Sequence, residues 1–488
     1  MKKKIFDRNQ ISLISAGLEK GLDVSQYNQL NSKGHPVFDW WQMTEIHEGL
    51  EKGLDVSKYN QLDSKGHPIF DFFQMFEIHE GLEEGLDVSK YNQLDPHSHP
   101  IYDGGQMSQI RKGLRDGLDI SKYNQLDPQG HPIFNWKQMS QIREGLRGGL
   151  DISKYNQLNH KGHPIFNWKR MERIRKGLEE GFDISQYNKL DSHGNPIFDR
   201  DQMSQIHIGL SQGLDISQYN KLDSHGHPIY DADQMTEIRK GLVQGLDISQ
   251  YNQLNSKGHP IFDGFQMQEI HEGLVQGLDI SKYTQLDSHG NPIFAWYQMH
   301  EIREGLRGGL DISQYTQLDP QGYPIYDGFQ MTEIRKGLRG GLDISQYNQL
   351  NHKGHPIFDG FQMEEIRYGL VQGLDVSQYN QLNSKGHPIF DDIQMHEIRE
   401  GLEKGLDVSK YNQLDPHSHP IFEWDQMNEI RKGLVQGLDV SKHTHLASKS
   451  SLSDFDKTPT DLQDSKVINE YNKSSHTPSD TQSKSRKL

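Results

Sequence analysis

The hydrophobic positions of this chain follow one short pattern that is repeated many times. In one copy, Met43, Ile46 and Leu50 lie three and four residues apart, which places them on one face of a helix. Mostly polar and charged residues fill the positions between them. The spacing predicts an amphipathic helix from about Asp39 to Lys52.

Both ends of this helix carry the expected signals. Asp39 is a favoured N-cap because its carboxylate accepts the free N–H groups of the first turn, and Gln42 completes a capping box. Gly53 is placed to end the helix in the left-handed conformation, and the apolar Leu54 follows it. A glycine inside a helix costs about 1 kcal/mol relative to alanine. Because Gly49 nevertheless recurs in each copy, we expect a neighbouring backbone to come close to it.

The segment after the helix is predicted to fold back in two short steps. Asp55 caps a short helical turn in which Val56 and Tyr59 face inward. Residues 62–66, Leu-Asp-Ser-Lys-Gly, suit a type I turn, with Asp at the first position and Gly at the last. His67 precedes a proline and is therefore expected to be extended.

The marker Gly-Leu/Phe-Asp recurs every 32 residues without an insertion. A unit of this size cannot bury both sides of its helix, so neighbouring copies must complete the core. We therefore expect a mainly α, elongated solenoid of 32-residue repeats, each with a long helix, a short helical turn and a hairpin-like turn. The repeats are expected over residues 5–442, after a lead of residues 1–4 and before a polar, disordered tail of residues 443–488. The marker glycines are Gly21, Gly53, Gly85, Gly117, Gly149, Gly181, Gly213, Gly245, Gly277, Gly309, Gly341, Gly373, Gly405 and Gly437.

Composition agrees with a thin core that is renewed in each repeat. Only 33% of the residues are hydrophobic, and the mean hydropathy is −0.84. The chain has no cysteine, which excludes disulfides and thiolate metal sites. Its net charge of −16 disfavours general nucleic-acid binding. The basic start has no apolar segment after it, and no stretch is long enough to span a membrane, so we expect a cytoplasmic protein, with surface association left open.

The motif Gln-Met-x-Glu-Ile-Arg-x-Gly-Leu, followed by Gly-Leu-Asp-Val-Ser-x-Tyr, stands at residues 394–411. It resembles the short repeats of proteins from Firmicutes and their mobile elements, over about residues 5–442. The resemblance implies a bacterial repeat protein and supplies no activity, cofactor or catalytic residue. This chain departs from those repeats by an added Asn-Gln-Leu-Asp-Ser-Lys-Gly-His-Pro-Ile-Phe segment, so their geometry does not carry over.

Equivalent residues of a solenoid form columns, and two columns hold groups that could bind metal. Asp23 and Asp55 head an aspartate column that could bind calcium, although the N-cap role alone accounts for it. A histidine column before the proline could bind metal, but Asn195, Asn291 and Tyr323 replace histidine in other copies, which favours hydrogen bonding in a turn. We expect no metal, cofactor or catalytic centre, since no phosphate loop, nucleophile elbow or zinc motif is present. The histidines are His35, His67, His99, His131, His163, His227, His259, His355, His387 and His419.

A third column alternates between histidine and arginine, as at His47 and Arg111. An acidic residue such as Glu45 often stands two residues earlier. We interpret this column as a charged ladder, which is either solvated or placed between repeats.

The two residues after the N-cap vary more than any other position. They change from Trp40-Trp41 to Gly104-Gly105 and to charged pairs, a range that a buried site would not accept. All six tryptophans lie in this pair. Its second member is opposite the apolar helix face, so we expect a row of exposed aromatic residues that binds partners. Drift at an unconstrained site, with the aromatic residues packed on the next repeat, is the alternative. The candidate binding residues are Trp40, Trp41, Phe72, Phe73, Trp136, Trp168, Phe265, Trp296, Tyr297, Phe329, Phe361 and Trp424.

These observations predict a non-enzymatic scaffold that binds protein partners along the aromatic row. The first alternative is a structural spacer, at a cell or virion surface, whose number of repeats sets its length. A modular nucleic-acid reader is the least favoured of the three functions, because the chain is acidic.

Overall fold

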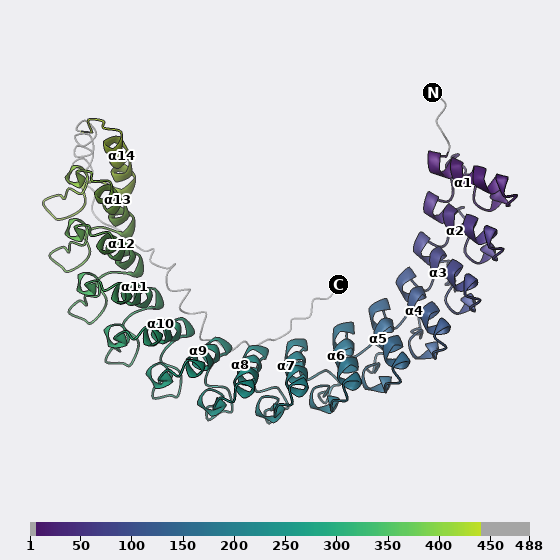
Figure 1. The fold of residues 1–488 in the computed structure, drawn as a ribbon, viewed down its shortest axis with the longest axis horizontal. Helices are drawn as coiled ribbons and strands as arrows, with labels where there is room; N and C mark the ends of the chain where they lie inside the picture. The colour runs from purple at the N-terminus through teal and green to yellow at the C-terminus, as the bar shows by residue number, and fades with distance from the viewer. Residues whose placement is uncertain (1–5, 441–488) are drawn as a thin grey trace, which may run out of the picture. The chain divides into compact units, whose positions relative to one another are not determined.

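The computed structural model describes residues 6–440, so the predicted lead and tail lie outside the described residues. The described residues form fourteen α-helices, joined by short 3₁₀ helices and turns. By their internal contacts they divide into a unit up to Met299 and a unit from His300, a boundary that falls inside α10. Within each unit, consecutive helices pack side by side in chain order, as Figure 1 shows. The fold is the mainly helical solenoid of 32-residue repeats that the sequence predicts.

The helices have the same length and spacing throughout. The α-helices are α1 (Arg8–Glu19), α2 (Trp40–Glu51), α3 (Phe72–Glu83), α4 (Gly104–Arg115), α5 (Trp136–Arg147), α6 (Trp168–Glu179), α7 (Arg200–Ser211), α8 (Ala232–Val243), α9 (Gly264–Val275), α10 (Trp296–Arg307), α11 (Gly328–Arg339), α12 (Gly360–Val371), α13 (Asp392–Glu403) and α14 (Trp424–Val435). The 3₁₀ helices are η1 (Val24–Gln26), η2 (Val56–Lys58), η3 (Val88–Lys90), η4 (Ile120–Lys122), η5 (Ile152–Lys154), η6 (Ile184–Gln186), η7 (Ile216–Gln218), η8 (Ile248–Gln250), η9 (Ile280–Lys282), η10 (Ile312–Gln314), η11 (Ile344–Gln346), η12 (Val376–Gln378) and η13 (Val408–Lys410).

The predicted helix ends are confirmed in α2. Asp39 Oδ1 accepts a hydrogen bond from the backbone N–H of Gln42 at 2.9 Å, and Gln42 Oε1 accepts one from the N–H of Asp39 at 3.0 Å. At the other end Gly53 has a φ of 69°. The N–H of Leu54 donates to the carbonyl oxygen of Gly49 at 2.8 Å. This geometry is the left-handed glycine ending that satisfies the last carbonyl groups of a helix.

Each repeat contributes the same small core. Met43 and Ile46 are fully buried on the long helix, and Phe38 and Tyr59 join them from the segments on either side. Leu50, which the helical spacing places on the same face, is only partly buried. The buried core of the long helix is therefore narrower than the apolar stripe that the sequence predicts.

Gly49 makes room for a side chain, and the expectation of a close neighbouring backbone is wrong. A Cβ at this position would overlap the Oη of Tyr59 and would lie 3.1 Å from a methyl group of Val56. The Tyr59 hydroxyl donates to the carbonyl oxygen of Glu45 at 3.1 Å. In the repeats of α1 to α13, the tyrosine that follows the short helix thus packs against the glycine of the long helix in the same repeat.

The predicted hairpin-like turn is present after η2. Asp63 Oδ1 accepts hydrogen bonds from the backbone N–H groups of Lys65 and His67, both at 2.8 Å. These bonds hold the pKa of the Asp63 carboxyl below its usual range, and the bond from His67 contributes most. Leu62 and Pro68 form a single β-bridge. Residues 6–440 contain only such isolated bridges and no strand.

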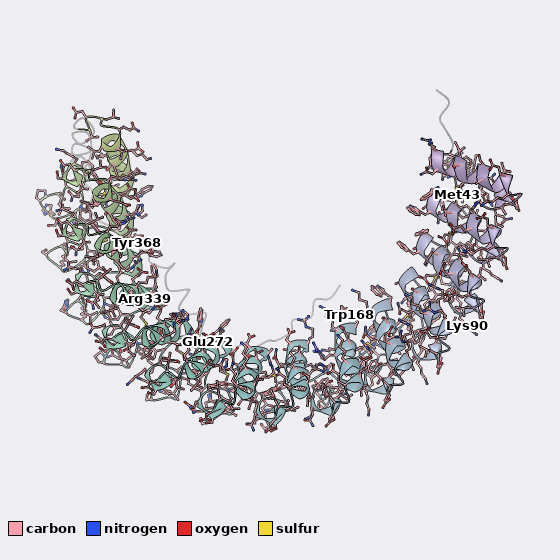
Figure 2. The ribbon with its side chains drawn as sticks, in the orientation of Figure 1. Met43, Lys90, Trp168, Glu272, Arg339 and Tyr368 are labelled. Carbon is pink, nitrogen blue, oxygen red and sulfur yellow. The ribbon has the colours of Figure 1, made fainter. Side chains whose placement is uncertain are left out.

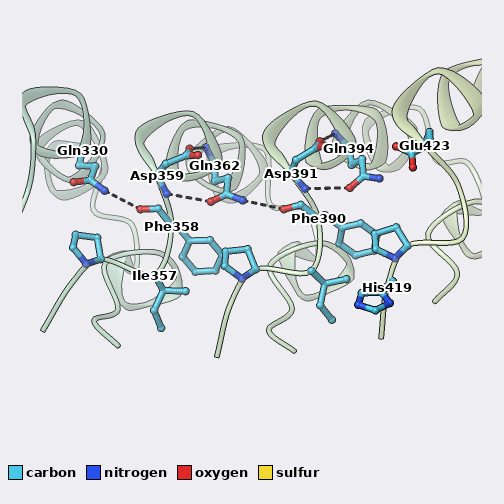
Figure 3. Close-up of a pocket in the computed structure, with 14 residues that line it drawn as sticks. Gln330, Ile357, Phe358, Asp359, Gln362, Phe390, Asp391, Gln394, His419 and Glu423 are labelled. Atoms are coloured by element: carbon cyan, nitrogen blue, oxygen red, sulfur yellow. Dashed lines mark hydrogen bonds between the residues drawn. The ribbon is translucent and has the colours of Figure 1, made fainter. Parts of the chain in front are cut away.

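A chain of amide groups joins consecutive repeats (Figure 3). Gln362 Nε2 donates to the carbonyl oxygen of Phe390 at 2.9 Å. The N–H of the same peptide group, which belongs to Asp391, donates to Gln394 Oε1 at 3.1 Å. Gln394 Nε2 in turn donates to the carbonyl oxygen of Phe422 at 3.0 Å. The capping glutamine therefore accepts a hydrogen bond from the N-cap N–H of its own helix and donates one to a backbone carbonyl group of the next repeat.

Candidate functional site

The variable pair forms the first two residues of each α-helix. Trp40 and Trp41 begin α2, and Trp168 begins α6. In the first unit, the long helices form one edge and the short helices form the opposite edge. Figure 2 shows Trp168 on the edge of the long helices and Lys90 on that of the short helices. The first two residues of α2 to α14 are called the variable row below.

Side chains of the variable row pack on one another across repeats. The ring centroids of Trp41 and Phe72 lie 5.6 Å apart. Those of Phe265 and Trp296 lie 5.5 Å apart. In both cases the second residue of one helix lies against the first residue of the next, so the row consists of linked side chains.

Where the first residue is glycine, the preceding side chain fills the space. A Cβ on Gly104 would lie 2.8 Å from the Cβ of Phe73, and a Cβ on Gly360 would overlap the ring of Phe329. The ring of Phe329 also lies 4.9 Å from that of Phe361, measured between centroids. The residue size in one repeat is therefore coupled to the residue size in the next.

Packing between repeats leaves much of the aromatic surface open to solvent. Phe73 is 68% exposed. Of the other candidate residues, those that are more than half exposed are Trp41, Phe265 and Phe361. Those with 42 to 46% of their surface exposed are Trp136, Trp296, Tyr297 and Trp424. The partly buried members are Trp40, Phe72, Trp168 and Phe329. The twelve candidate residues thus all lie in the variable row, and the second member is usually the more exposed one.

The aromatic residues fall into separate groups and do not form a continuous strip. In the first unit the groups lie on α2–α3, on α5–α6, and on α9 with the start of α10. Glycines occupy the row at α4, and Arg200, Asp201, Ala232 and Asp233 occupy it at α7 and α8. In the second unit the aromatic residues lie on α11–α12 and at the start of α14.

The third column is a buried ladder between repeats. Arg111 Nε donates to Glu77 Oε2 at 2.7 Å, and the Arg111 side chain is only 7% exposed. This finding resolves the alternative that the sequence left open, since a solvated ladder would leave these groups exposed. Further pairs of the ladder are His79 with Glu45, Arg143 with Gln109, Arg175 with Gln141, Arg239 with Gln205, His271 with Glu237, Arg335 with Glu301, Arg367 with Glu333, Arg399 with Glu365, and Arg431 with Glu397.

Contacts between repeats shift the pKa values of Glu365 in the ladder and of His396 beside it. Burial by itself would raise the pKa of Glu365, but hydrogen bonds from His396 and Arg399 outweigh it and hold this pKa below the usual value. The same hydrogen bond raises the pKa of His396. Glu365 is therefore ionised at neutral pH, and its two oxygens are hydrogen-bonded to two side chains of the next repeat.

The ladder lacks its acceptor between α6 and α7. Arg173 stands where the neighbouring repeats have Gln141 and Gln205. It faces His207, whose buried Nδ1 has no hydrogen-bond partner. Arg173 donates to Ser204 Oγ at 3.1 Å instead. Burial and then the charge of Arg173 lower the pKa of His207.

The aspartate column caps the short helices, and the histidine column lies in the hairpin-like turns. Asp55 Oδ1 accepts from the N–H of Ser57 at 3.2 Å and from its hydroxyl at 2.5 Å, as expected for a cap. His67 is exposed in its turn, with Nδ1 3.5 Å from Asp63 Oδ2. Within residues 6–440, no group of three His, Cys, Asp or Glu side chains is placed to hold a metal ion.

Grooves follow the amide chain on the side of the hairpin-like turns. In the second unit such a groove has a volume of about 630 Å³, and Pro356, Ile357 and Pro388 contribute to its lining (Figure 3). A similar groove in the first unit has Pro36 and Pro68 in its lining. Because nearly the same residue types recur in each repeat, these grooves offer little that distinguishes one repeat from another.

No family model, curated protein or solved structure matches this chain. The resemblance to the repeat proteins of Firmicutes therefore rests on the quoted motif alone. In the part of the chain that the structure describes, none of the helices has the length and apolar character needed to cross a bilayer.

Proposed function

We propose that this protein is a non-enzymatic repeat scaffold that binds protein partners along the variable row. One observation carries the proposal: the row keeps large aromatic side chains exposed after they have packed on their neighbours, as for Phe73 at 68%. Aromatic residues are the usual anchors of protein interfaces, because they bury a large area with few rotatable bonds. A partner that covered these rings would gain the free energy of removing them from water.

The other positions of the repeat support this assignment by their structural roles. Each of the following features accounts for one recurring residue type: the caps, the Met–Ile–Tyr core, the contact between glycine and tyrosine, the turn and the ladder. The variable row changes in size and charge from copy to copy, and so does the helix position of Glu48, which is Ile208 in one copy and Tyr368 in another. Of these positions, the row holds most of the exposed aromatic side chains, so it is where different copies can recognise different parts of a partner.

Separate aromatic groups favour a partner that binds at more than one point. A partner held at one group meets the next group at a high effective concentration, so weak contacts add up to a stable complex. The intervening glycines and charged pairs then limit which partners fit, because an apolar segment gains little by covering them.

Photo-crosslinking in the cells that make the protein tests the proposal. A photoreactive phenylalanine analogue replaces Phe73 or Phe265 in the row, and in the control it replaces Tyr323, which is 66% exposed but lies in a turn. We expect one or a few crosslinked proteins, identified by mass spectrometry, from both row positions and none of them from position 323. Equal background crosslinking from all three positions would contradict the proposal.

The spacer is the second candidate function, and the amide chain is the observation that favours it. These hydrogen bonds tie one repeat to the next independently of the variable row. Deleting residues 232–263 removes one repeat without an aromatic pair and restores the capping sequence at the junction. A scaffold keeps its crosslinks at Phe73 and Phe265 after this deletion. A spacer has no such crosslinks to keep, and the cellular structure whose length it sets becomes shorter.

A further inference from the structure

Helix α6 is basic, although the chain as a whole carries a net charge of −16. Its only acidic residues are Glu172 and Glu179. Its cations are Lys169, Arg170, Arg173, Arg175 and Lys176. Such a local excess of positive charge attracts anions to this part of an otherwise acidic surface.

A hollow of about 380 Å³ lies between α6 and α7. The cations in its lining are Lys169, Arg173, Lys176 and Arg200. Its two carboxylates are already paired, Glu172 with Lys176 at 2.9 Å and Asp201 with Arg200 at 2.7 Å. Within the described part of the chain, Lys169 and Arg173 have no carboxylate within ion-pair distance, so the hollow keeps an uncompensated positive charge.

Arg173 is the residue that sets this interface apart from its neighbours. The equivalent Gln141 and Gln205 each accept a hydrogen bond at 2.9 Å from an arginine of the following helix. Arg173 can only donate, and it reaches across the hollow to Ser204 Oγ at 3.1 Å. The interface therefore holds a buried His207 Nδ1 without a hydrogen-bond partner, and it lacks the acceptor that the ladder has at the two neighbouring interfaces.

The rim of the hollow adds an aromatic ring. Trp168 lines the hollow, and the ammonium groups of Lys137 and Lys169 lie 4.9 and 5.5 Å from the centre of its ring. These contacts hold both lysines near the opening, since a cation is attracted to the face of an indole. They also make Trp168 a spectroscopic reporter for any anion that draws the lysines away.

We propose that the hollow between α6 and α7 is a binding site for a dianionic phosphate group. Lys169 and Arg173 supply the opposite charge, and the guanidinium of Arg173 can donate two parallel hydrogen bonds to phosphate oxygens. The hydroxyl of Ser204 is a further donor on the opposite wall. The bound phosphate compensates the positive charge that Lys169 and Arg173 leave in the hollow. This inference goes beyond the proposed function and does not rest on it.

Fluorine NMR of the full chain tests the site. The six tryptophans are labelled as 5-fluorotryptophan, and Trp168→Phe assigns the signal of Trp168. Inorganic phosphate is added at neutral pH and constant ionic strength, with chloride as the balancing anion. We expect a saturable shift of the Trp168 signal with a Kd of about 1 mM or below, and little change at tryptophans distant from the hollow. A linear or absent response up to about 10 mM phosphate would overturn the proposal.

Two charge-matched variants separate binding at the hollow from general attraction. Arg173→Gln introduces the residue of the neighbouring repeats, so the fold is kept, and we expect phosphate binding about tenfold weaker or more. Arg147→Gln removes an exposed cation of α5 that does not line the hollow, and we expect unchanged binding. Equal weakening by both variants, or none by Arg173→Gln, would show that the hollow is not the site.

A third titration identifies the source of the phosphate. A short phosphoserine peptide and its unphosphorylated form are compared with inorganic phosphate. Binding of the phosphopeptide about tenfold tighter than phosphate assigns the site to a phosphorylated protein segment, whereas equal affinities assign it to the free ion. Binding of the unphosphorylated peptide with the same affinity would contradict the phosphate assignment.

Discussion

Gln362 Nε2 and the carbonyl oxygen of Phe390 lie 2.9 Å apart and join two consecutive repeats. The Oε1 atom of the same carboxamide accepts a hydrogen bond from the N–H of Asp359 at 3.1 Å. Each amide of this chain thus donates and accepts at once, so that neighbouring bonds polarise one another in the same direction. Because most repeats make the same bond to the next, the stacking of repeats is regular whatever the variable row contains.

Replacing this glutamine tests the amide chain. Gln362→Met keeps the shape of the side chain but leaves the carbonyl of Phe390 and the N–H of Asp359 without their partner. We expect a loss of about 1–3 kcal/mol in the free energy of local opening. Hydrogen exchange followed by mass spectrometry should show faster exchange at the start of α12.

The control for this prediction is Gln381→Met. Gln381 is exposed and its Nε2 donates only to the carbonyl oxygen of Ser377 in its own repeat. We expect little change in exchange from this variant. Equal effects of the two substitutions would show that the bond between repeats adds nothing.

A side chain at the mid-helix glycine is expected to be costly. A Cβ on Gly241 would overlap the hydroxyl of Tyr251 and lie 2.9 Å from a methyl group of Ile248. Overpacking of this kind costs about 1–3 kcal/mol and should exceed the gain of roughly 1 kcal/mol in helix propensity. Gly241→Ala, and more so Gly241→Leu, should therefore lower the denaturant midpoint.

Two further variants locate the cause of this effect. Tyr251→Phe removes the overlapping hydroxyl, so the double variant with Gly241→Ala should be more stable than the sum of the single changes predicts. Gly340→Ala is the matched control, since the nearest atoms to its Cβ would lie at 3.5 Å and its φ is −80°. A stabilised Gly241→Ala would show that the tyrosine moves away at no cost.

The buried ladder should tolerate glutamine and reject leucine. The side chain of Glu333 is fully buried and pairs with Arg367 and Lys336. Glu333→Gln resembles the natural pair of Gln205 with Arg239, so we expect a loss of about 1 kcal/mol or less. Glu333→Leu leaves the Arg367 guanidinium buried without its partner, which typically costs about 3–5 kcal/mol. Thermal unfolding of both variants checks this order, and equal losses would contradict it.

Acid should destabilise the α6–α7 interface through His207. The folded pKa of His207 lies below its unfolded value of about 6.5, because burial and Arg173 oppose its charge while Glu180 favours it. The unfolded state therefore binds more protons as the pH falls below about 6.5, and stability is lost from there down to the folded pKa. The stability difference between wild type and His207→Gln should be constant at higher pH and change only below that point.

Reversing the charge opposite His207 should reverse this dependence. Arg173→Glu recreates the pair that Glu45 forms with His79 at 2.7 Å. The new carboxylate should raise the pKa of His207 above its unfolded value, so that stability is gained below this pKa and lost as the pH rises through it. Urea unfolding of the variants from mildly acidic to neutral pH measures both signs. Identical pH profiles for wild type and Arg173→Glu would rule out the assigned contact.

The glutamine at the third helical position has a second role, and the sequence contains a signal for it that arguments from spacing overlook. The third helical position is glutamine in every copy except α6, where it is Arg170, and it is never glutamate. Either residue completes a capping box. Only glutamine can also donate to the next repeat, as Gln42 does to the carbonyl oxygen of Phe70 at 3.0 Å. The absence of glutamate was therefore the signal for a bond that spans 28 residues.

The sequence by itself determined the elements of each repeat and their boundaries. The capping box of Asp39 and Gln42 and the glycine ending at Gly53 involve atoms within a few residues of one another, so local geometry decides them. The inward face of Met43 and Ile46 follows from the helical period, and the 32-residue recurrence implies stacking.

Only the tertiary structure decided which groups meet between elements. It placed the Tyr59 hydroxyl, rather than a backbone, against Gly49, and it buried the ladder that the sequence left open to solvent or interface. It also decided the exposure of the variable row, because the exposure of Phe73 depends on the size of the residue in the next repeat, which here is Gly104. These contacts depend on the distance and angle at which repeats stack, and that geometry results from all the packing and hydrogen bonds of the interface acting together.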